Sequence, residues 1–288
     1  NGDLTCFESA TGKPVWRRNL VRDFDGRSPQ WGYAESPLID AGRVVCSPGG
    51  EKTAMVALDL RDGAAVWECR AAGDPPADAS PMLVDHGGLR QVVTMTADSV
   101  IGVAADTGRF LWRYEREAPY DVNAATPVHR DGKLAIFTTW GRGATQLRLL
   151  VEGVDCRVEK AWHNPEFDVE HGGVVLLENT LYGCADGNHK KRLWAAVDWE
   201  TGRTCYTADG PAGRSGTLTY ADGMLYLVGE RGEVSLQRAA PAKFEIAGRF
   251  QLPNGGDGPV WARPVVCGGR LYLRHGEALF AYDVRAPQ

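Results

Sequence analysis

The chain has 288 residues, of which 43% are hydrophobic and 24% are charged, and its formal net charge is −5. That length and hydrophobic content suit one large domain with a sizeable core, and no linker or low-complexity run interrupts it. The acidic balance argues against nucleic-acid binding and against an anionic membrane surface, and no apolar run is long enough to span a membrane.

A short phrase recurs along the chain: a turn that ends in Gly is followed four residues later by an aromatic residue. The copies pair Gly12 with Trp16, Gly63 with Trp67, Gly108 with Trp112, and Gly202 with Tyr206. They step by about 45 to 50 residues when the last interval is counted as two periods, which is the range of propeller-type repeats. One four-stranded antiparallel unit fits that length.

A second sequence pattern supports the same period. A residue pair that ends in Pro or Gly, usually after a small residue, recurs where each unit would begin. These pairs are Ser36–Pro37, Ser80–Pro81, Thr126–Pro127, Gly172–Gly173, Ser215–Gly216 and Arg263–Pro264. A short apolar run, a tight turn and a second β-rich run follow each pair, which predicts a hairpin. The turns are expected at residues 40–42, 85–88, 130–132, 178–179, 221–223 and 268–269.

No window sustains a helical apolar period, so we expect an all-β chain: a β-propeller of four-stranded antiparallel blades, with about six to seven blades present. Five complete units start at Ser36, Ser80, Thr126, Gly172 and Ser215. Two strands lead them within residues 4–20, and three strands trail them within residues 263–284. We expect residues 1–288 to form a single domain.

The chain begins in the middle of a repeat, and no signal peptide is visible in the given sequence. Two leading and three trailing strands exceed one blade by a strand. We therefore expect a fragment that lacks an N-terminal blade and a half, with an open or imperfectly shut ring. A compact six-bladed ring with a surplus strand is the alternative.

The seven cysteines have no C-x-x-C spacing, so we interpret them as small buried residues rather than as a metal or redox centre. They are Cys6, Cys46, Cys69, Cys156, Cys184, Cys205 and Cys267.

At the Gly-to-Trp phrases the chain resembles the pyrroloquinoline-quinone-like β-propellers, whose tryptophan-docking repeat reads A-x-D-x-x-T-G-x-x-x-W. The best copy is Ala105 to Trp112, and partial copies begin at Ala57, Ala196 and Ala281. The resemblance implies that the Trp of one blade packs on its neighbour. It covers almost the whole chain, with one degenerate unit around residues 152–162. A WD-repeat propeller, the competing fold, lacks the Thr-Gly turn.

The resemblance is closest to exported bacterial members, often labelled polyvinyl-alcohol-dehydrogenase-like, which have eight blades. It implies an eight-bladed parent and a periplasmic or extracellular location.

The hairpin turns are uniformly tight, whereas the loops that emerge on the opposite face are long, so we expect function on this long-loop face. Residues just before each first strand would lie nearest the central axis, and one middle loop adds a tryptophan. The expected ligand-binding residues are Trp31, Tyr33, Glu35, Asn123, Trp140, Glu170, His171, Arg214 and Trp261. Such a polar and aromatic surface suits a protein, a polysaccharide or a small molecule.

Structural alternatives stay open for these residues. The three tryptophans could close the end of the channel, and Glu35 could accept backbone N–H groups at the loop rim. His171 beside Glu170 is the usual pairing for proton transfer, although a lone histidine near a strand start is also commonly structural. His163, Asp168 and His171 match no standard metal-ligand spacing.

Three functions remain for this fold. The first is a non-enzymatic binding or scaffold protein, with no catalytic residue, metal or cofactor. The second is a calcium-dependent and pyrroloquinoline-quinone-dependent alcohol dehydrogenase. Such enzymes carry an adjacent Cys-Cys pair that this chain lacks, although Glu35 and Asn123 are hard oxygen donors suitable for calcium. The third is a scaffold similar to the propeller lipoprotein of the outer-membrane assembly machinery.

Overall fold

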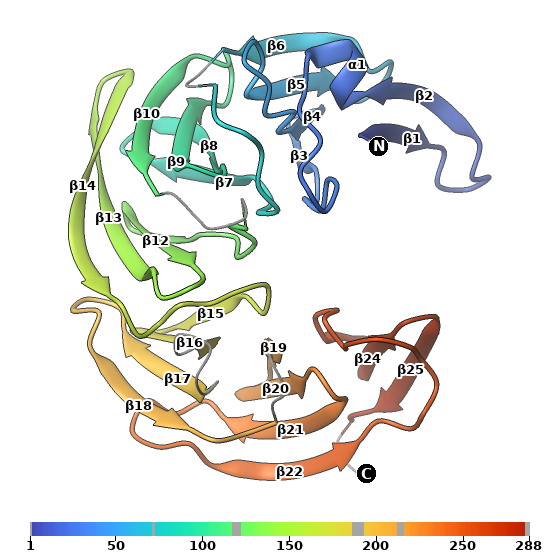
Figure 1. Ribbon diagram of the computed structural model, residues 1–288, viewed down its shortest axis with the longest axis vertical. Helices are drawn as coiled ribbons and strands as arrows, with labels where there is room; N and C mark the ends of the chain where they lie inside the picture. The colour runs from blue at the N-terminus through green and yellow to red at the C-terminus, as the bar shows by residue number, and fades with distance from the viewer. Residues whose placement is uncertain (1, 71–72, 117–121, 186–192, 212–215, 286–288) are drawn as a thin grey trace. The chain divides into compact units, whose positions relative to one another are not determined.

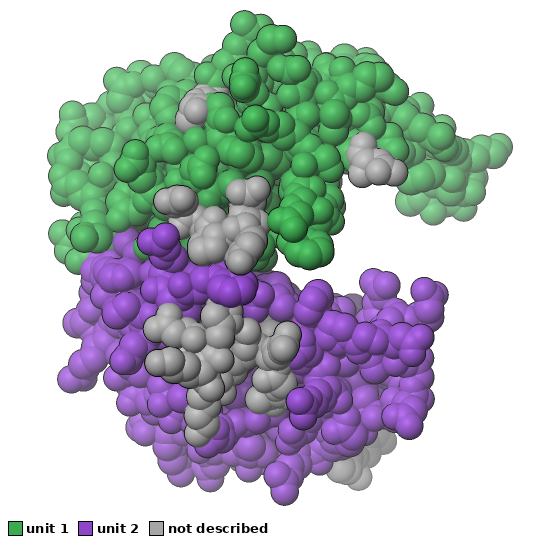
Figure 2. Space-filling model, in the orientation of Figure 1, with its two compact units in different colours: residues 1–138, 146–161 green, residues 139–145, 162–288 purple. Residues whose placement is uncertain are grey.

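The computed structural model describes residues 2–70, 73–116, 122–185, 193–211 and 216–285 (Figure 1). The chain divides into two compact units, coloured separately in Figure 2. Unit 1 comprises residues 1–138 and 146–161, and unit 2 comprises residues 139–145 and 162–288. That residues 1–288 form a single domain stays a prediction.

The described residues form antiparallel sheets and one short helix, which confirms the predicted all-β propeller class. Five sheets have four strands each, and in each of them the strands follow one another in chain order. A two-stranded sheet precedes these five sheets and a three-stranded sheet follows them. The five complete units, the two leading strands and the three trailing strands are therefore where the repeat predicted them.

Unit 1 begins with the two-stranded sheet and the helix, which are followed by two complete four-stranded sheets (Figure 1). Its elements are β1 (Asp3–Phe7), β2 (Pro14–Asn19), α1 (Leu20–Phe24), β3 (Leu38–Asp40), β4 (Arg43–Cys46), β5 (Met55–Asp59), β6 (Ala65–Cys69), β7 (Met82–His86), β8 (Leu89–Met95), β9 (Ser99–Ala104) and β10 (Phe110–Glu115).

The next sheet contributes residues to both units, because the boundary between the units falls within two of its strands. Its strands are β11 (Val128–Arg130), β12 (Lys133–Thr138), β13 (Gly143–Glu152) and β14 (Asp155–Asn164).

Unit 2 contains two complete four-stranded sheets and the three-stranded sheet. Its strands are β15 (Val174–Leu177), β16 (Thr180–Ala185), β17 (Leu193–Asp198), β18 (Thr204–Ala208), β19 (Gly216–Ala221), β20 (Met224–Gly229), β21 (Glu233–Arg238), β22 (Ile246–Gln251), β23 (Val265–Cys267), β24 (Arg270–His275) and β25 (Ala278–Asp283).

The hairpin turns have the backbone conformation that their residues predict. In the β3–β4 turn Ala41 and Gly42 have φ values of 46° and 76°, and in the β19–β20 turn Asp222 and Gly223 have values of 49° and 79°. Two consecutive positive φ angles match the right-handed twist of the paired strands. In each turn glycine occupies the second position and so adopts the larger positive φ without strain, while Ala41 or Asp222 occupies the first.

Tryptophans dock on the turn glycines of the following sheet, as the resemblance implied. A β-carbon built on Gly63 would lie 2.7 Å from the ring of Trp16, and one built on Gly108 would lie 2.7 Å from the ring of Trp67. The indole nitrogens donate to nearby carbonyls, Trp16 Nε1 to Leu60 at 2.9 Å and Trp67 Nε1 to Ala105 at 3.0 Å. The glycine makes room for the ring, and the carbonyl satisfies its N–H.

The degenerate unit changes this docking in two ways. Trp112 faces a sheet without a Thr-Gly turn, and its Nε1 instead donates to Gln91 Oε1 of its own sheet at 2.7 Å. Trp162, at the end of the long strand β14, docks on Gly202 and donates to the Trp199 carbonyl at 3.0 Å. The four-residue spacing missed Trp162 because the β13–β14 hairpin is longer than its counterparts.

The one described helix, α1, lies in the predicted long loop between β2 and β3 and is an addition to the expected all-β chain. Asn19 caps its N-terminus by accepting a hydrogen bond from the Arg22 N–H, and Asp25 ends it in the left-handed conformation. Its buried residues Leu20 and Phe24 pack against β4 and β5. The helix thereby fixes the loop that carries the first candidate site. Among the described residues, no helix is both long and apolar enough to cross a membrane.

Candidate functional site

In unit 1, Glu35 precedes β3 and its carboxyl group faces the start of the β4–β5 loop. Its Oε1 accepts a hydrogen bond from the Ser47 N–H at 2.8 Å, whereas its Oε2 is buried without a hydrogen-bond partner. Burial raises the pKa of Glu35 to about 7, against the opposing effect of the hydrogen bond from the Ser47 N–H. The backbone contact predicted for Glu35 is thus present, and one carboxylate oxygen remains unused.

Glu35 lines a pocket of about 580 Å³ in unit 1. Its other walls come from the segment around β1 and from residues near α1, β3 and β4: Gly2, Asp3, Leu4, Thr5, Phe7, Leu20, Tyr33, Pro37 and Cys46. The lining mixes apolar and polar groups, and its carboxyl groups belong to Asp3 and Glu35. Ligand sites commonly combine apolar walls with a small number of polar groups.

Tyr33 is the second expected site residue in this pocket, and Trp31 is not part of it. The Tyr33 hydroxyl donates to the Pro48 carbonyl at 2.9 Å, and burial raises its pKa. This bond ties the loop before β3 to the loop after β4. Trp31 lies in a turn with 72% of its surface exposed, so its indole is available to a partner but is not held by the pocket.

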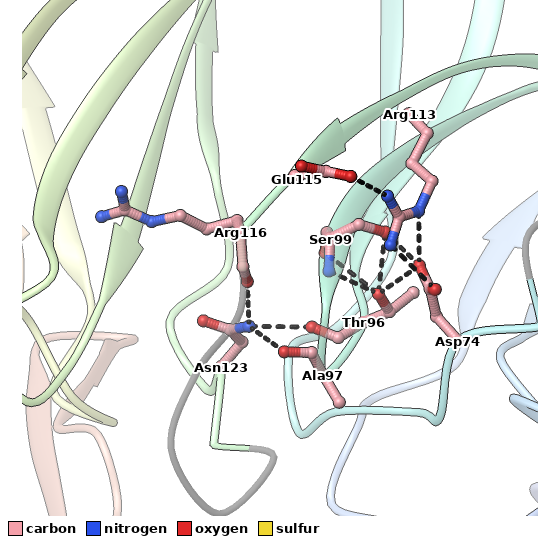
Figure 3. A network of polar contacts seen from close by, with 8 residues as sticks. All are labelled: Asp74, Thr96, Ala97, Ser99, Arg113, Glu115, Arg116 and Asn123. Atoms are coloured by element: carbon pink, nitrogen blue, oxygen red, sulfur yellow. Dashed lines mark hydrogen bonds and ion pairs between the residues drawn. The ribbon is translucent and has the colours of Figure 1, made fainter.

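Asn123 lies elsewhere in unit 1 and is completely buried (Figure 3). Its amide nitrogen donates to the Thr96 carbonyl at 2.8 Å and, at 3.4 Å each, to the carbonyls of Ala97 and Arg116. These bonds fasten the segment before β11 to the β8–β9 turn, so the amide nitrogen has a structural role. Its Oδ1 is buried and has no hydrogen-bond partner.

An ion pair lies beside this anchor, as Figure 3 shows. Arg113 on β10 donates to both carboxylate oxygens of Asp74 at 3.0 Å, and the hydroxyls of Thr96 and Ser99 also donate to Asp74. Burial alone would raise the pKa of Asp74, but the hydrogen bonds from Arg113 and Ser99 outweigh it and hold the pKa below its usual range. No sequence pattern predicted this pair, because its members are 39 positions apart.

In unit 2, three expected site residues come together. The rings of His171 and Trp261 pack with centroids 4.6 Å apart and a tilt of 54°, and His171 Nδ1 lies 4.0 Å from Glu170 Oε1. Trp261 is 52% exposed, yet its Nε1 donates to Glu230 Oε1 at 3.0 Å. An exposed tryptophan is thus held in one orientation from two sides. Glu230 was not predicted, because nothing in the sequence relates it to a tryptophan 31 positions later.

The two loops that carry His171 and Trp261 also approach through glycines. A β-carbon on Gly173 would lie 2.0 Å from the guanidinium of Arg263, and a β-carbon on Gly172 would lie 1.9 Å from the Gly216 carbonyl. The Gly-Gly pair therefore allows the guanidinium of Arg263 and the Gly216 carbonyl to approach the segment that follows His171. We call Glu170, His171, Glu230, Trp261 and Arg263 the His171–Trp261 patch.

The other candidate residues of unit 2 are not part of the His171–Trp261 patch. Trp140 is 42% exposed in a turn with φ of 61°, and the next N–H, that of Gly141, donates to the buried carboxylate of Asp168 at 2.8 Å. His163 Nδ1 lies 3.0 Å from the Thr145 hydroxyl. Arg214 lies outside the described residues.

The two oxygen donors considered for calcium lie against different loops of unit 1. Glu35 Oε1 accepts the Ser47 N–H after β4, and the Asn123 amide nitrogen donates to the β8–β9 turn. Within the described ranges, no group of three or more His, Cys, Asp or Glu side chains is placed to hold a metal ion.

Comparison with known proteins supports the repeat architecture. The family model described as outer membrane protein assembly factor BamB matches residues 1–196. The crystal structure of BamB from Moraxella catarrhalis superimposes with a TM-score of 0.69 and 15% identity, over 97% of this chain and 78% of that chain. These matches confirm the predicted resemblance.

Two further solved structures share the fold. The computationally designed Ika8 protein has a TM-score of 0.64 and 12% identity, over 98% of this chain and 78% of that chain. Quinohemoprotein alcohol dehydrogenase from Comamonas testosteroni has a TM-score of 0.59 and 13% identity, over 96% of this chain and 61% of that chain. At such identities the likeness concerns the fold alone. A search of curated proteins gives no match to this sequence.

Proposed function

Because the chain belongs to the family of the outer membrane protein assembly factor BamB, we propose that it is a non-enzymatic scaffold that binds a protein partner during the assembly of outer-membrane proteins. The proposal places the protein in the periplasm of a bacterium, attached to or close to the outer membrane. Its partner-binding surface includes the His171–Trp261 patch of unit 2.

The observation that carries this proposal is the fixed, exposed indole of Trp261. Half of its surface is accessible, while Glu230 holds its nitrogen and His171 packs on its ring. A large aromatic side chain held in its binding orientation loses little rotamer entropy when a partner covers it, and such residues dominate protein interfaces. Glu230 contacts the indole and Glu170 lies beside His171, and such polar neighbours suit the rim of an interface.

Two features favour a protein partner over a small substrate at this patch. The pocket described in unit 2, of about 640 Å³, is lined by residues 254–257, 276 and 277, and the patch residues do not contribute to it. The patch itself presents an exposed aromatic group beside carboxylates. Exposed aromatic groups are commonly buried by a protein partner, whereas small molecules are usually enclosed in a pocket.

The quinone-dependent dehydrogenase remains a second hypothesis without an observation of its own. Its support is a shared fold at 13% identity. We therefore assign no catalytic residue and no cofactor.

Gene deletion with complementation tests the proposal in the organism that produces the protein. We expect deletion to lower the amount of folded outer-membrane β-barrel proteins, and the wild-type gene to restore it. Trp261→Ala should fail to restore it at equal protein level, whereas Asp222→Asn, in a tight hairpin turn, should restore it fully. Normal barrel assembly in the deletion strain would contradict the proposed function.

A further inference from the structure

Two histidines join the hairpin turns of successive sheets in unit 1. His86 is the last residue of β7, and His129 lies on β11. Their rings meet edge to face, with centroids 6.3 Å apart and a tilt of 64°, and both side chains are partly buried. We call His86, His129 and the turn residue Gly132 the His86–His129 contact.

His86 occupies the position over Gly132 that tryptophans occupy over the turn glycines of other sheets. A β-carbon built on Gly132 would lie 2.3 Å from His86 Nε2, and the φ of Gly132 is 72°. The next residue, Gly87, packs on the apolar side chain of Val151 in β13, where a β-carbon would approach to 3.0 Å. The β7–β8 turn therefore packs closely on the following sheet, through an ionisable ring in place of an indole.

The same glycine is bound by His129, and this bond requires a neutral ring. The Gly132 N–H donates to His129 Nε2 at 3.3 Å. Because a backbone N–H can only donate, Nε2 must be the acceptor nitrogen, and the proton of the neutral imidazole is then on Nδ1. A proton taken up at Nε2 would leave two donors facing each other, so it breaks the bond.

The charges around His129 favour its neutral form near neutral pH. Burial lowers the pKa of His129 and the charge of His86 lowers it further, whereas Asp131 acts in the opposite direction. Asp131 lies 4.0 Å from Arg130 Nε, so its charge is partly offset. The other charged residues of the two turns, with their partners and the residue after Val151, are Asp85, Arg90 paired with Asp40 and Asp106, Lys133 and Glu152.

We propose that the His86–His129 contact is a pH-sensitive switch between two hairpin turns: it is closed while both rings are neutral and opens when they take up protons. Protonation of His129 removes the acceptor of the Gly132 N–H. Protonation of both rings also places two positive charges against each other in a partly buried contact, which favours separation. Opening releases the β7–β8 turn from Gly132.

Nuclear magnetic resonance of the full chain with nitrogen-15-labelled histidine tests the first part of this proposal. In alkaline solution His129 should be the tautomer that carries its proton on Nδ1, and on acidification it should titrate below the ordinary pKa of 6.5. His86→Gln removes the neighbouring positive charge and should therefore raise the pKa of His129. The resonances of His129 are assigned by their loss in His129→Gln.

Hydrogen exchange of the Gly132 amide, corrected for its intrinsic pH dependence, measures the opening. Exchange should accelerate by up to about tenfold for each unit that the pH falls below 6.5, until the folded pKa of His129 is reached. The Gly223 amide is the matched control, because the β19–β20 turn is also an Asp-Gly turn but no atom lies within 4 Å of a β-carbon on Gly223. Its exchange should show no such acceleration.

His129→Gln separates the switch from a merely structural contact. The glutamine oxygen can accept the Gly132 N–H but cannot be protonated in this range, so the acceleration at Gly132 should disappear while circular dichroism shows a folded protein. Acceleration that persists in His129→Gln, or that is equal at Gly132 and Gly223, would overturn the proposal. So would a His129 tautomer with its proton on Nε2, or a His129 pKa that is unchanged in His86→Gln.

Discussion

Trp67 on β6 lies directly over the α-carbon of Gly108 in the turn between β9 and β10, where a β-carbon would approach the ring to 2.7 Å. The two residues belong to successive copies of one repeated phrase. Position 108 requires glycine for two reasons. Its φ of 72° is unfavourable for other residues, and the indole of Trp67 occupies the space that a side chain would need. This docking joins adjacent sheets of unit 1.

Removing the docked ring should destabilise the fold. We expect Trp67→Ala, at a tryptophan only 8% exposed, to lower the free energy of unfolding by about 3 to 5 kcal/mol. Chemical denaturation followed by circular dichroism measures this loss. Trp31→Ala is the matched control, because that indole is 72% exposed and its removal should leave stability within about 0.5 kcal/mol. Equal stability of the two variants would show that the docked indole does not hold the sheets together.

The Asp74–Arg113 ion pair should stabilise the fold through its charges. Asp74→Asn keeps the shape but leaves the guanidinium of Arg113 without a carboxylate, so we expect a loss of roughly 2 kcal/mol at neutral pH. The folded pKa of Asp74 is lowered, so its stabilisation is present above its unfolded pKa and disappears as the pH falls through the folded value. Urea titrations should show the two proteins converging below about pH 4. A constant difference at all pH values would mean that the charge is not the cause.

Stability should depend on the ionisation of Glu35 in the opposite direction to that of Asp74, because the pKa of Glu35 is raised. Its folded pKa of about 7 exceeds its ordinary value of 4.5, so the folded state holds its proton more tightly and loses stability as the pH rises between these values. The loss amounts to about 3 kcal/mol for one fully desolvated group. Glu35→Gln cannot titrate, so its stability should fall less over that interval. Parallel stability curves for the wild type and Glu35→Gln would contradict the raised pKa.

Glu230 should position Trp261. Glu230→Ala removes the acceptor at 3.0 Å from the indole nitrogen, and we expect the ring to gain mobility while the fold is kept. Fluorine NMR of protein labelled with fluorotryptophan measures this, with the Trp261 resonance assigned by Trp261→Phe. The resonance should shift or broaden in Glu230→Ala and stay unchanged in Glu233→Ala, a neighbouring carboxylate on β21. An unaffected Trp261 resonance would remove the positioning role.

Local sequence signals predicted much of the fold. Turn residues such as Ala41–Gly42 and Asp222–Gly223 set the hairpins because their backbone conformation depends on few neighbours. Trp67 was predictable for the same reason, since its glycine recurs at a fixed distance. Trp162 was missed because its hairpin is longer, and α1 because a helix of five residues is too short for a periodic pattern.

The candidate sites were less predictable because they depend on contacts between distant segments. The list of expected residues included His171 and Trp261, but not the bond from Trp261 to Glu230 that fixes its indole. Glu35 was weighed as a backbone acceptor, and only the packing around β1 reveals its second, unused oxygen. Asn123 resembled a surface amide in the sequence but is buried by the β8–β9 turn.

Site-specific photo-cross-linking tests the scaffold function most directly. A photoreactive amino acid replaces the exposed Pro259, close to Trp261 in the chain, or Asp222 in a hairpin turn, and cells are irradiated before the products are identified by mass spectrometry. We predict that position 259 yields a product with a protein of the outer-membrane assembly machinery, that Trp261→Ala abolishes it, and that position 222 yields none. The same product at position 222 and not at position 259, or a product at 259 that survives Trp261→Ala, would contradict the proposed partner surface.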